Sequence, residues 1–315
     1  MTGRQRREIR DTCAINGAGA ARTVTRVNTS PTRDSLVESN VLHRLGAAWE
    51  ALFPKRSGKG ARRRHLESDL SRFFPSSANF WLYPELTYSA ANNFPQQLLT
   101  LLRQERGTDQ PAAMDAETFN NSAPFEPLAE LFEKHGSDKA SHGYASVYAR
   151  VLREIGHDVD LLEIGLGTIR PDAVSTMGAS GKPGASLRAF RDFLPQARLY
   201  GADVDRSILF TEPRVRTAFV DQTALATFDA MTATLGCEAF DLIIDDGLHS
   251  SEANLNTTIF GLRALKNGGW LVIEDIPERT LAVWQVVASL LAGLPLACVL
   301  IKCRSAHVFA IKKQG

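Results

Sequence analysis

The feature that most constrains the fold is a regular alternation of short apolar runs and helical patterns from residue 159 onward. Apolar, β-branched runs without polar alternation are typical of strands that are buried on both faces. Alternating strands and helices predict a doubly wound, Rossmann-like α/β sheet. Two final runs, Cys298 to Cys303 and His307 to Ile311, predict an antiparallel hairpin, so the expected sheet is mixed and seven-stranded.

The individual elements follow from apolar periodicity and from the residues that begin or end it. The other five strands are expected at Val159 to Ile164, Ala197 to Val204, Val215 to Val220, Phe240 to Ile244 and Trp270 to Ile273. The expected helices are Leu128 to Lys134, Tyr144 to Ile155, one capped by Ser186 and running to Phe193, Thr223 to Leu235, Ser251 to Leu265 and Glu278 to Leu291. Upstream, helices are expected from Asn40 to Phe53 and from Gln96 to Arg106.

Two of the predicted strands end abruptly in acidic residues. The first is followed by two aspartates and then a histidine, and the second by a glutamate and an aspartate: Asp245, Asp246, His249, Glu274 and Asp275. If these strands are parallel neighbours, their carboxyl ends meet at the edge of the sheet where ligands bind in open α/β folds. Carboxylate oxygens beside an imidazole suit a hard divalent cation such as Mg²⁺. We expect Asp245 itself to cap the following helix.

A glycine motif follows the first predicted strand, in Leu161-Leu-Glu-Ile-Gly-Leu-Gly167. Its glycines permit a tight turn and a close approach of the backbone to a ligand. The third glycine of a dinucleotide fingerprint is missing, and an NAD site remains a rival interpretation. Acidic or amide residues end the next two strands, where they are placed to contact a ribose and an adenine: Asp203, Asp221 and Gln222.

Composition limits the class of protein. The chain has 315 residues, of which 44% are hydrophobic and 23% charged, a profile typical of a globular protein. There is no apolar run of membrane-spanning length and no zinc-type cysteine spacing, and a cytoplasmic location is expected. Residues 1–64 contain 14 Lys and Arg against 5 Asp and Glu. We expect a disordered basic tail at 1–34, a helical accessory region at 35–125 and an α/β domain at 126–315.

Several motifs, taken together, resemble one family. The stretches are Gly136-Ser-Asp-Lys139, His142-Gly-Tyr144, Leu162-Glu-Ile-Gly165, Gly184-Ala-Ser-Leu-Arg188, Asp221-Gln222, Asp245-Asp-Gly-Leu-His249 and Ile273-Glu-Asp275. Their order and spacing resemble the class I S-adenosylmethionine-dependent methyltransferases, and more narrowly the metal-dependent sugar O-methyltransferases of antibiotic pathways. They are also similar to the cephalosporin-hydroxylase-like group. Leu248 departs from the family, which has serine before the motif histidine.

This resemblance implies a function and a set of site residues. It implies methyl transfer from S-adenosylmethionine to a hydroxyl of a small acceptor such as a sugar or glycoside. It implies His249 as general base and a Mg²⁺ or other divalent ion held by Asp246, Glu274 and Asp275. The cofactor would be held by the glycine motif, the ends of the next two strands and two upstream residues: Glu163, Gly165, Gly167, Asp203, Asp221, Gln222, Lys139 and Tyr144.

Other functions stay open from the sequence alone. A hydroxylase is one, although no His-x-Asp iron motif is evident. A scaffolding protein that binds the cofactor without turnover is another. The basic tail raises RNA methylation, but the tail lacks interleaved aromatic residues and any known binding motif, so nucleic acid is not the expected partner. We expect neither a membrane partner nor a monomer: the region before residue 126 is expected to form a homo-oligomer.

Overall fold

The computed structural model describes residues 94–104 and 112–315. The expected tail at 1–34, the expected helix from Asn40 and most of the accessory region therefore lie outside the described residues, and the predicted homo-oligomer stays a prediction. A helix covers residues 94–104, close to the range expected from the sequence. No helix in the described segments is both long and apolar enough to span a membrane.

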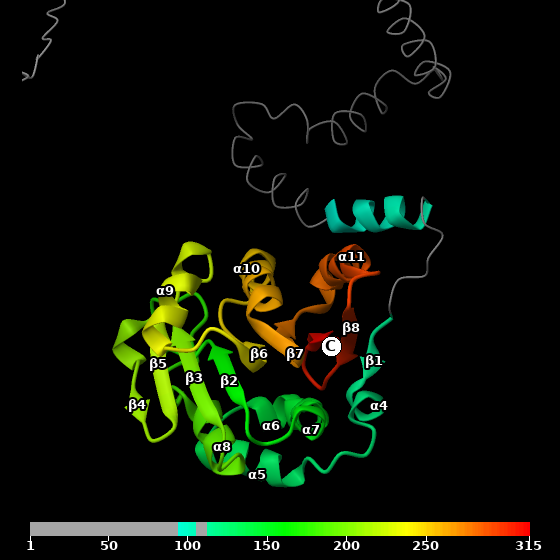
Figure 1. Ribbon diagram of the computed structural model, residues 1–315. Helices are drawn as coiled ribbons and strands as arrows, with labels where there is room; N and C mark the ends of the chain where they lie inside the picture. Colours follow the sequence, from blue (N-terminus) through cyan, green and yellow to red (C-terminus); the bar gives the residue numbers. More distant parts are fainter. Residues whose placement is uncertain (1–93, 105–111) are drawn as a thin grey trace, which may run out of the picture. The chain divides into compact units, whose positions relative to one another are not determined.

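A central mixed sheet organises the rest of the described chain (Figure 1). Within the described residues it has nine strands in the order β1-β8-β9-β7-β6-β2-β3-β5-β4. The central strands pair in parallel, and β9 runs antiparallel to both of its neighbours. The strands are β1 (Met114–Asp115), β2 (Asp160–Ile164), β3 (Arg198–Asp203), β4 (Thr211–Glu212), β5 (Val215–Phe219), β6 (Phe240–Asp245), β7 (Leu265–Ile276), β8 (Leu296–Lys302) and β9 (His307–Lys313).

The seven strands expected from the sequence are all present, and two short strands extend the sheet. Strand β4 pairs antiparallel with β5, and β1 pairs in parallel with β8. Each has two residues, too few for an apolar period to appear in the sequence. Because β1 precedes residue 126, residues upstream of the expected domain start also belong to this sheet.

Helices cover both faces of the sheet (Figure 1). One layer contains α4 (Ala116–Asn120), α5 (Glu126–His135), α6 (Lys139–His142), α7 (Tyr144–Ile155) and α8 (Ala185–Phe193). The other contains α9 (Ala226–Leu235), α10 (Ser251–Ala264) and α11 (Leu281–Leu291). Short 3₁₀ turns, η2 (Arg206–Ile208) and η3 (Glu278–Thr280), precede β4 and α11. The predicted doubly wound α/β class is therefore confirmed.

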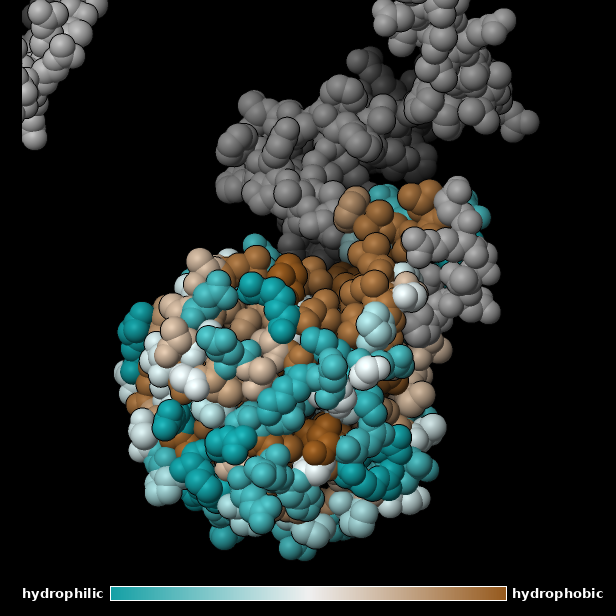
Figure 2. All heavy atoms as spheres, in the orientation of Figure 1, coloured by the Kyte–Doolittle hydropathy of each residue, from teal (hydrophilic) through white to brown (hydrophobic). Residues whose placement is uncertain are grey.

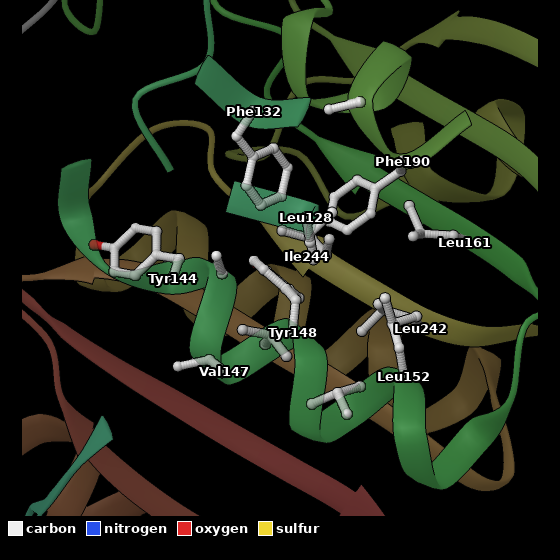
Figure 3. Packing of buried hydrophobic residues seen from close by; sticks show 14 of the residues in the cluster. Leu128, Phe132, Tyr144, Val147, Tyr148, Leu152, Leu161, Phe190, Leu242 and Ile244 are labelled. Carbon is white, nitrogen blue, oxygen red and sulfur yellow. The ribbon is translucent and has the colours of Figure 1, made fainter. Parts of the chain in front are cut away.

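The buried side chains form a core on each side of the sheet. In the core beneath α5, α7 and α8, three aromatic rings meet edge to face (Figure 3). The ring centroids of Phe132 and Phe190 are 5.2 Å apart, and those of Tyr148 and Phe190 are 5.3 Å apart. Such pairs add about 0.5–1.5 kcal/mol to the burial of their area. This packing fixes the positions of α5 and α7, the helices on either side of the short helix α6.

Surface polarity differs between the two helical layers in the view of Figure 2. Hydrophilic residues dominate over α5 to α8, and hydrophobic residues are more frequent over α10 and α11. The most exposed apolar residue of α11 is Leu290, at 64% of its surface. Helix α11 consists mostly of hydrophobic residues, with two polar side chains, Gln285 and Ser289.

Two predicted helix caps are wrong. Ser186 lies inside α8, whose N-cap is Gly184, and its hydroxyl donates instead to Glu163 Oε2 at 2.7 Å. Asp245 does not cap α10 either, because Ser250 is the N-cap and its Oγ accepts from the N–H of Ala253. In both cases the side chain hydrogen-bonds to a residue distant in sequence instead of capping the nearby helix, the role that its residue type favours.

Candidate functional site

A cavity of about 380 Å³ opens at the carboxyl ends of the central strands. It is lined by the loop after β2, by the ends of β3, by the residues after β5 and by the turn after β6. Asp275, near the end of β7, completes this wall. The edge predicted from the acid-terminated strands is therefore the edge at which the structure has its cavity.

Three of the predicted residues converge at this cavity. Asp246, His249 and Asp275 each offer a ligand atom, and these atoms lie within 4.8 Å of one another. The Nε2 atom of His249 is 3.6 Å from Oδ2 of Asp275. Each of these side chains is between one fifth and one third exposed, so all three face solvent through the cavity. Two hard oxygen donors and one imidazole form a set that can hold a divalent cation.

Asp275 is held in an unusual backbone conformation. Its φ angle is 53°, in the left-handed region that few non-glycine residues adopt. The pairing of β7 with β9 is interrupted at the same place, between Ile273 and Ile276. The hydroxyl of Tyr144 donates to Oδ1 of Asp275 at 2.5 Å, and His142 Nδ1 lies 3.6 Å from the same oxygen. The interrupted strand thus turns the Asp275 carboxylate toward the cavity, where Tyr144 fixes it.

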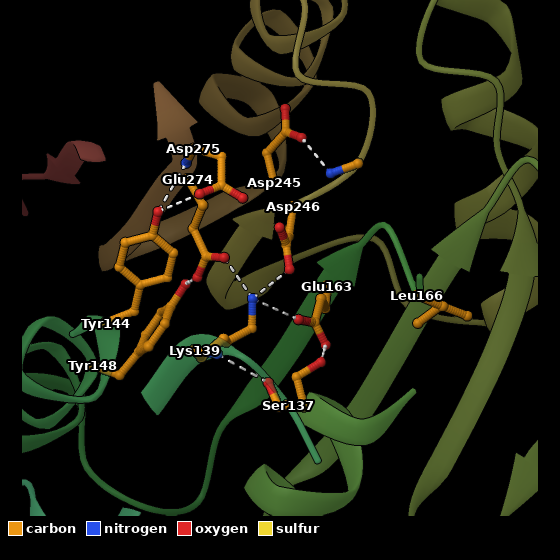
Figure 4. Close-up of polar contacts among 12 residues, drawn as sticks. Ser137, Lys139, Tyr144, Tyr148, Glu163, Leu166, Asp245, Asp246, Glu274 and Asp275 are labelled. Atoms are coloured by element: carbon orange, nitrogen blue, oxygen red, sulfur yellow. Dashed lines mark hydrogen bonds and ion pairs between the residues drawn. The ribbon is translucent and has the colours of Figure 1, made fainter. Parts of the chain in front are cut away.

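Lys139 occupies the centre of a buried cluster of carboxylates (Figure 4). Its amine lies 2.5 Å from Glu274, 2.6 Å from Asp246 and 3.2 Å from Glu163, and its side chain is 1% exposed. These acids come from the ends of three different strands, so one amine joins β2, β6 and β7 at the edge that carries the site. Lys139 does not line the cavity, and its contact with the cofactor stays a prediction.

The charges of this cluster are strongly perturbed. Burial alone would lower the pKa of Lys139, but Asp246 and Glu274 raise it well above its usual value, so the amine stays protonated. Burial raises the pKa of Glu163, and raises that of Glu274 well above its ordinary value, against the opposing effect of Lys139. Tyr148 donates a hydrogen bond to the second oxygen of Glu274. The pKa of Tyr148 is raised, chiefly by burial, which keeps it a donor.

The metal-ligand role that the family resemblance implies for Glu274 stays a prediction, and in the structure its carboxylate is engaged by other side chains. Both of its oxygens are used inside the protein, one by Lys139 and one by Tyr148. It is 1% exposed and does not line the cavity. In this geometry Glu274 supports the neighbouring Asp246 through their shared lysine and presents no oxygen to the cavity.

The glycine loop is fixed against the acidic turn. Gly165 has a φ angle of 95°, and a Cβ atom there would lie 2.1 Å from the carbonyl oxygen of Asp246. The N–H of Asp246 donates to the carbonyl of Ile164 at 2.8 Å. Gly167 has a φ angle of 81°, and a Cβ atom there would collide with Met177. Glycine at 165 is therefore required by the contact between the loop and Asp246 as well as by the turn itself.

Of the other predicted cofactor residues, Glu163 and Tyr144 are buried and do not line the cavity. Asp203, Asp221 and Gln222 do line it, but the protein already uses their polar atoms. Asp203 accepts from the N–H groups of Leu166 and Asp205 at 2.7 and 2.8 Å. Asp221 accepts from the N–H of Thr223 at 2.9 Å. Both carboxylates nevertheless line the cavity and retain lone pairs that a ligand can reach.

The amide of Gln222 is engaged on both sides. Its Nε2 donates to Asp245 and to Thr257 at 2.8 and 2.9 Å, and its Oε1 accepts from the N–H of Leu248 at 2.7 Å. Gln222 therefore holds the turn that carries Leu248 and His249 against the end of β6. This role was not expected from the sequence, which placed the amide against an adenine.

Sequence reasoning passed over three residues near the site. Tyr148 is four residues after Tyr144, so the two share one face of α7, and that spacing was available as a signal. His142 was quoted in a family motif but was given no role in the site, yet it lies beside Asp275. Lys182 lines the cavity from the loop after β2; neither its spacing nor its neighbours in sequence mark it.

Comparison with known proteins gives relatives of one kind. No family model matches the chain. It is 30% identical over 151 residues to the 8-demethyl-8-alpha-L-rhamnosyl tetracenomycin-C 2'-O-methyltransferase of Streptomyces olivaceus, covering 47% of this chain and 37% of that protein. It is 31% identical over 153 residues to the mycinamicin VI 2''-O-methyltransferase of Micromonospora griseorubida, covering 47% and 36%. The chain thus spans well under half the length of these two curated relatives.

Solved structures were compared as well. The MycE methyltransferase from the mycinamycin biosynthetic pathway, in complex with Mg and SAH, aligns with a TM-score of 0.49 and 24% identity, covering 61% of this chain and 56% of that one. The strand order of the sheet and the sequence relatives lead to one conclusion. Over 47% of its length the chain is related in sequence to sugar O-methyltransferases of tetracenomycin and macrolide pathways, and its described part has a doubly wound α/β fold.

Proposed function

We propose that this chain is a metal-dependent O-methyltransferase. It would transfer the methyl group of S-adenosylmethionine to a hydroxyl of a small acceptor, a sugar or glycoside. The observation that carries the proposal is the convergence of Asp246, His249 and Asp275 at one cavity beside the glycine loop. The sequence relatives that are O-methyltransferases of glycosylated compounds support the choice of acceptor.

The cavity suits the methyl donor. Two glycines with positive φ angles let the backbone of the loop after β2 approach a ligand closely. Aspartates at the ends of β3 and after β5 offer acceptors for ribose and adenine donors. Acidic side chains also favour the positive charge of a sulfonium. We therefore assign the cavity to S-adenosylmethionine, with Asp203 at the ribose and the Asp221 region at the base.

The acidic wall suits a divalent cation. Asp246 and Asp275 present carboxylate oxygens to the cavity, and Mg²⁺ is commonly held by one or two carboxylates and several waters. A divalent ion bound there would lower the pKa of an acceptor hydroxyl and fix its orientation. Lys139 and Tyr144 hold these two carboxylates in place from behind. We propose Asp246 and Asp275 as the ligands, with Glu274 in support.

We propose His249 as the base that receives the proton lost by the acceptor hydroxyl. It lies three residues after Asp246, in the turn that Gln222 holds through Leu248. Its side chain is 32% exposed and borders the cavity. Histidine accepts protons readily near neutral pH. A base in this position would act on a hydroxyl that is bound beside the two aspartates.

The first test separates two roles that His249 could have, base or metal ligand. Methyl transfer to a glycoside acceptor and Mn²⁺ binding by calorimetry are measured for wild type and for His249→Ala. A base predicts a loss of turnover of about 10²- to 10⁴-fold with Mn²⁺ affinity retained. His157→Ala is the matched control, because His157 is exposed and outside the cavity.

Two results would contradict the proposal. Full turnover of His249→Ala would exclude His249 as the base. Loss of Mn²⁺ affinity in the same variant would indicate that His249 is a metal ligand instead. Catalysis that is unaffected by a chelator would remove the metal. Both measurements are made on the full chain with S-adenosylmethionine present, so that the cavity is occupied as it would be in turnover.

A further inference from the structure

S-adenosylmethionine carries two positive groups, the sulfonium and the amino group, and one carboxylate. A cavity that binds it must therefore offer acidic groups to the sulfonium and the amino group, and one positive group to the carboxylate. The residues lining the cavity include five aspartates, and Lys182 is the one Lys or Arg among them in the described part of the chain. A carboxylate placed beside those acids would be repelled, so the distribution of charge directs it to Lys182.

Lys182 is free to receive a carboxylate. It belongs to the loop between β2 and α8, its side chain is exposed, and it makes no ion pair with the described acidic residues. Its Nζ lies 3.0 Å from the point where a Cβ on Gly136 would be, so the amine rests against the Gly136 turn at the wall of the cavity. A side chain at position 136 would displace it.

Lys139, the lysine that the family motif suggested for this role, is already committed. Its amine is surrounded by Glu163, Asp246 and Glu274 (Figure 4), and Lys139 does not line the cavity. The start of α8 adds support for Lys182: Ser186, in its first turn, lines the same cavity. The N–H groups of a first helical turn favour an anion.

We infer that Lys182 binds the carboxylate at the amino-acid end of S-adenosylmethionine. The inference rests on the proposed function and gives one side chain of the loop after β2 a specific part in it. It predicts that the contribution of Lys182 to binding depends on whether the ligand has a carboxylate. A lysine that merely shaped the cavity would affect ligands with and without that group alike.

The test compares two ligands that differ in the amino-acid end. S-adenosylhomocysteine keeps it, and 5′-methylthioadenosine has the adenosine and the sulfur but lacks it. Calorimetry gives the Kd of each for the full chain and for Lys182→Met, Lys182→Arg and the exposed control Lys134→Met. A charge-assisted contact predicts that Lys182→Met weakens S-adenosylhomocysteine about 10- to 100-fold. The Kd of 5′-methylthioadenosine should stay as in wild type.

The outcomes separate the inference from the function beneath it. Retained S-adenosylhomocysteine affinity in Lys182→Arg, with control values in Lys134→Met, would support the charge contact. The inference would be overturned if Lys182→Met weakened the binding of both ligands equally, or weakened the binding of neither. In that case, binding of both ligands by the wild-type chain would still support the assignment of the cavity. Failure of wild type to bind either ligand would overturn the assignment itself. Lys182 is an exposed loop residue, so unfolding of the variant is not expected.

Discussion

Replacing Lys139 by methionine tests the organisation of the site most severely. The substitution keeps the length of the side chain and removes the charge that Glu163, Asp246 and Glu274 share. Glu163 and Glu274 are 0% and 1% exposed, so these two acids would remain buried without a cation. Removing one partner of a buried ion pair costs about 3–5 kcal/mol. That is a large part of the 5–15 kcal/mol expected for the unfolding of a typical domain.

Urea unfolding followed by circular dichroism measures this loss. We expect the free energy of unfolding of Lys139→Met to fall by about 3–5 kcal/mol with an unchanged m value. Lys134→Met, on the exposed surface of α5, should stay within about 0.5 kcal/mol of wild type. The double variant Lys139→Met/Glu274→Gln should be more stable than the sum of its single variants, by about 0.5–3 kcal/mol, because one unpaired charge is gone. A Lys139→Met chain of wild-type stability would refute the argument.

Two further predictions concern the loop and the opposite end of the sheet. Gly165→Ala should lower the free energy of unfolding by about 2 kcal/mol and weaken the binding of S-adenosylhomocysteine. The reason is that alanine would combine a φ of 95° with a Cβ atom 2.1 Å from the carbonyl oxygen of Asp246. A variant with the stability and the S-adenosylhomocysteine affinity of wild type would contradict this prediction. Asp160 has a lowered pKa: burial opposes the shift, but hydrogen bonds from Arg198 and Lys266 outweigh it. Its stabilisation should be complete above about pH 4 and be lost as pH falls through the lowered folded-state pKa. Asp160→Asn should therefore be less stable than wild type at pH 6 and approach it in more acid solution; a difference independent of pH would contradict the assignment.

The fold could be predicted where burial decides the pattern. Strand β6 and helix α7 (Tyr144–Ile155) form where their apolar residues predict them, because both elements are largely buried and burial sets their sequence pattern. The acids at the ends of β6 and β7 come together because parallel neighbours end at the same edge. The two-residue strand β1 could not be predicted, since pairing with β8, far along the chain, is its whole basis.

The finer chemistry of the site could not be predicted from local patterns. The amine of Lys139 meets Asp246 and Glu274, which are 107 and 135 residues away in sequence. No spacing rule reports such a contact, and the family motif gave the lysine a different role. Ser186 shows the same limit: its residue type favours a helix cap, but a buried carboxylate on β2 takes its hydroxyl. The partners of these side chains are set by electrostatic contacts between residues far apart in sequence, and such contacts can be identified only in the folded structure.

The central claim is that Asp246 and Asp275 bind one divalent ion beside the methyl donor, with His249 next to it. The most direct measurement is a crystal structure of the full chain with S-adenosylhomocysteine and Mn²⁺, with data collected at the manganese edge. The account predicts one anomalous peak between these two carboxylates, and the sulfur of the ligand in the cavity next to it. A manganese peak elsewhere, or an ordered ligand in the cavity with no manganese between Asp246 and Asp275, would contradict it.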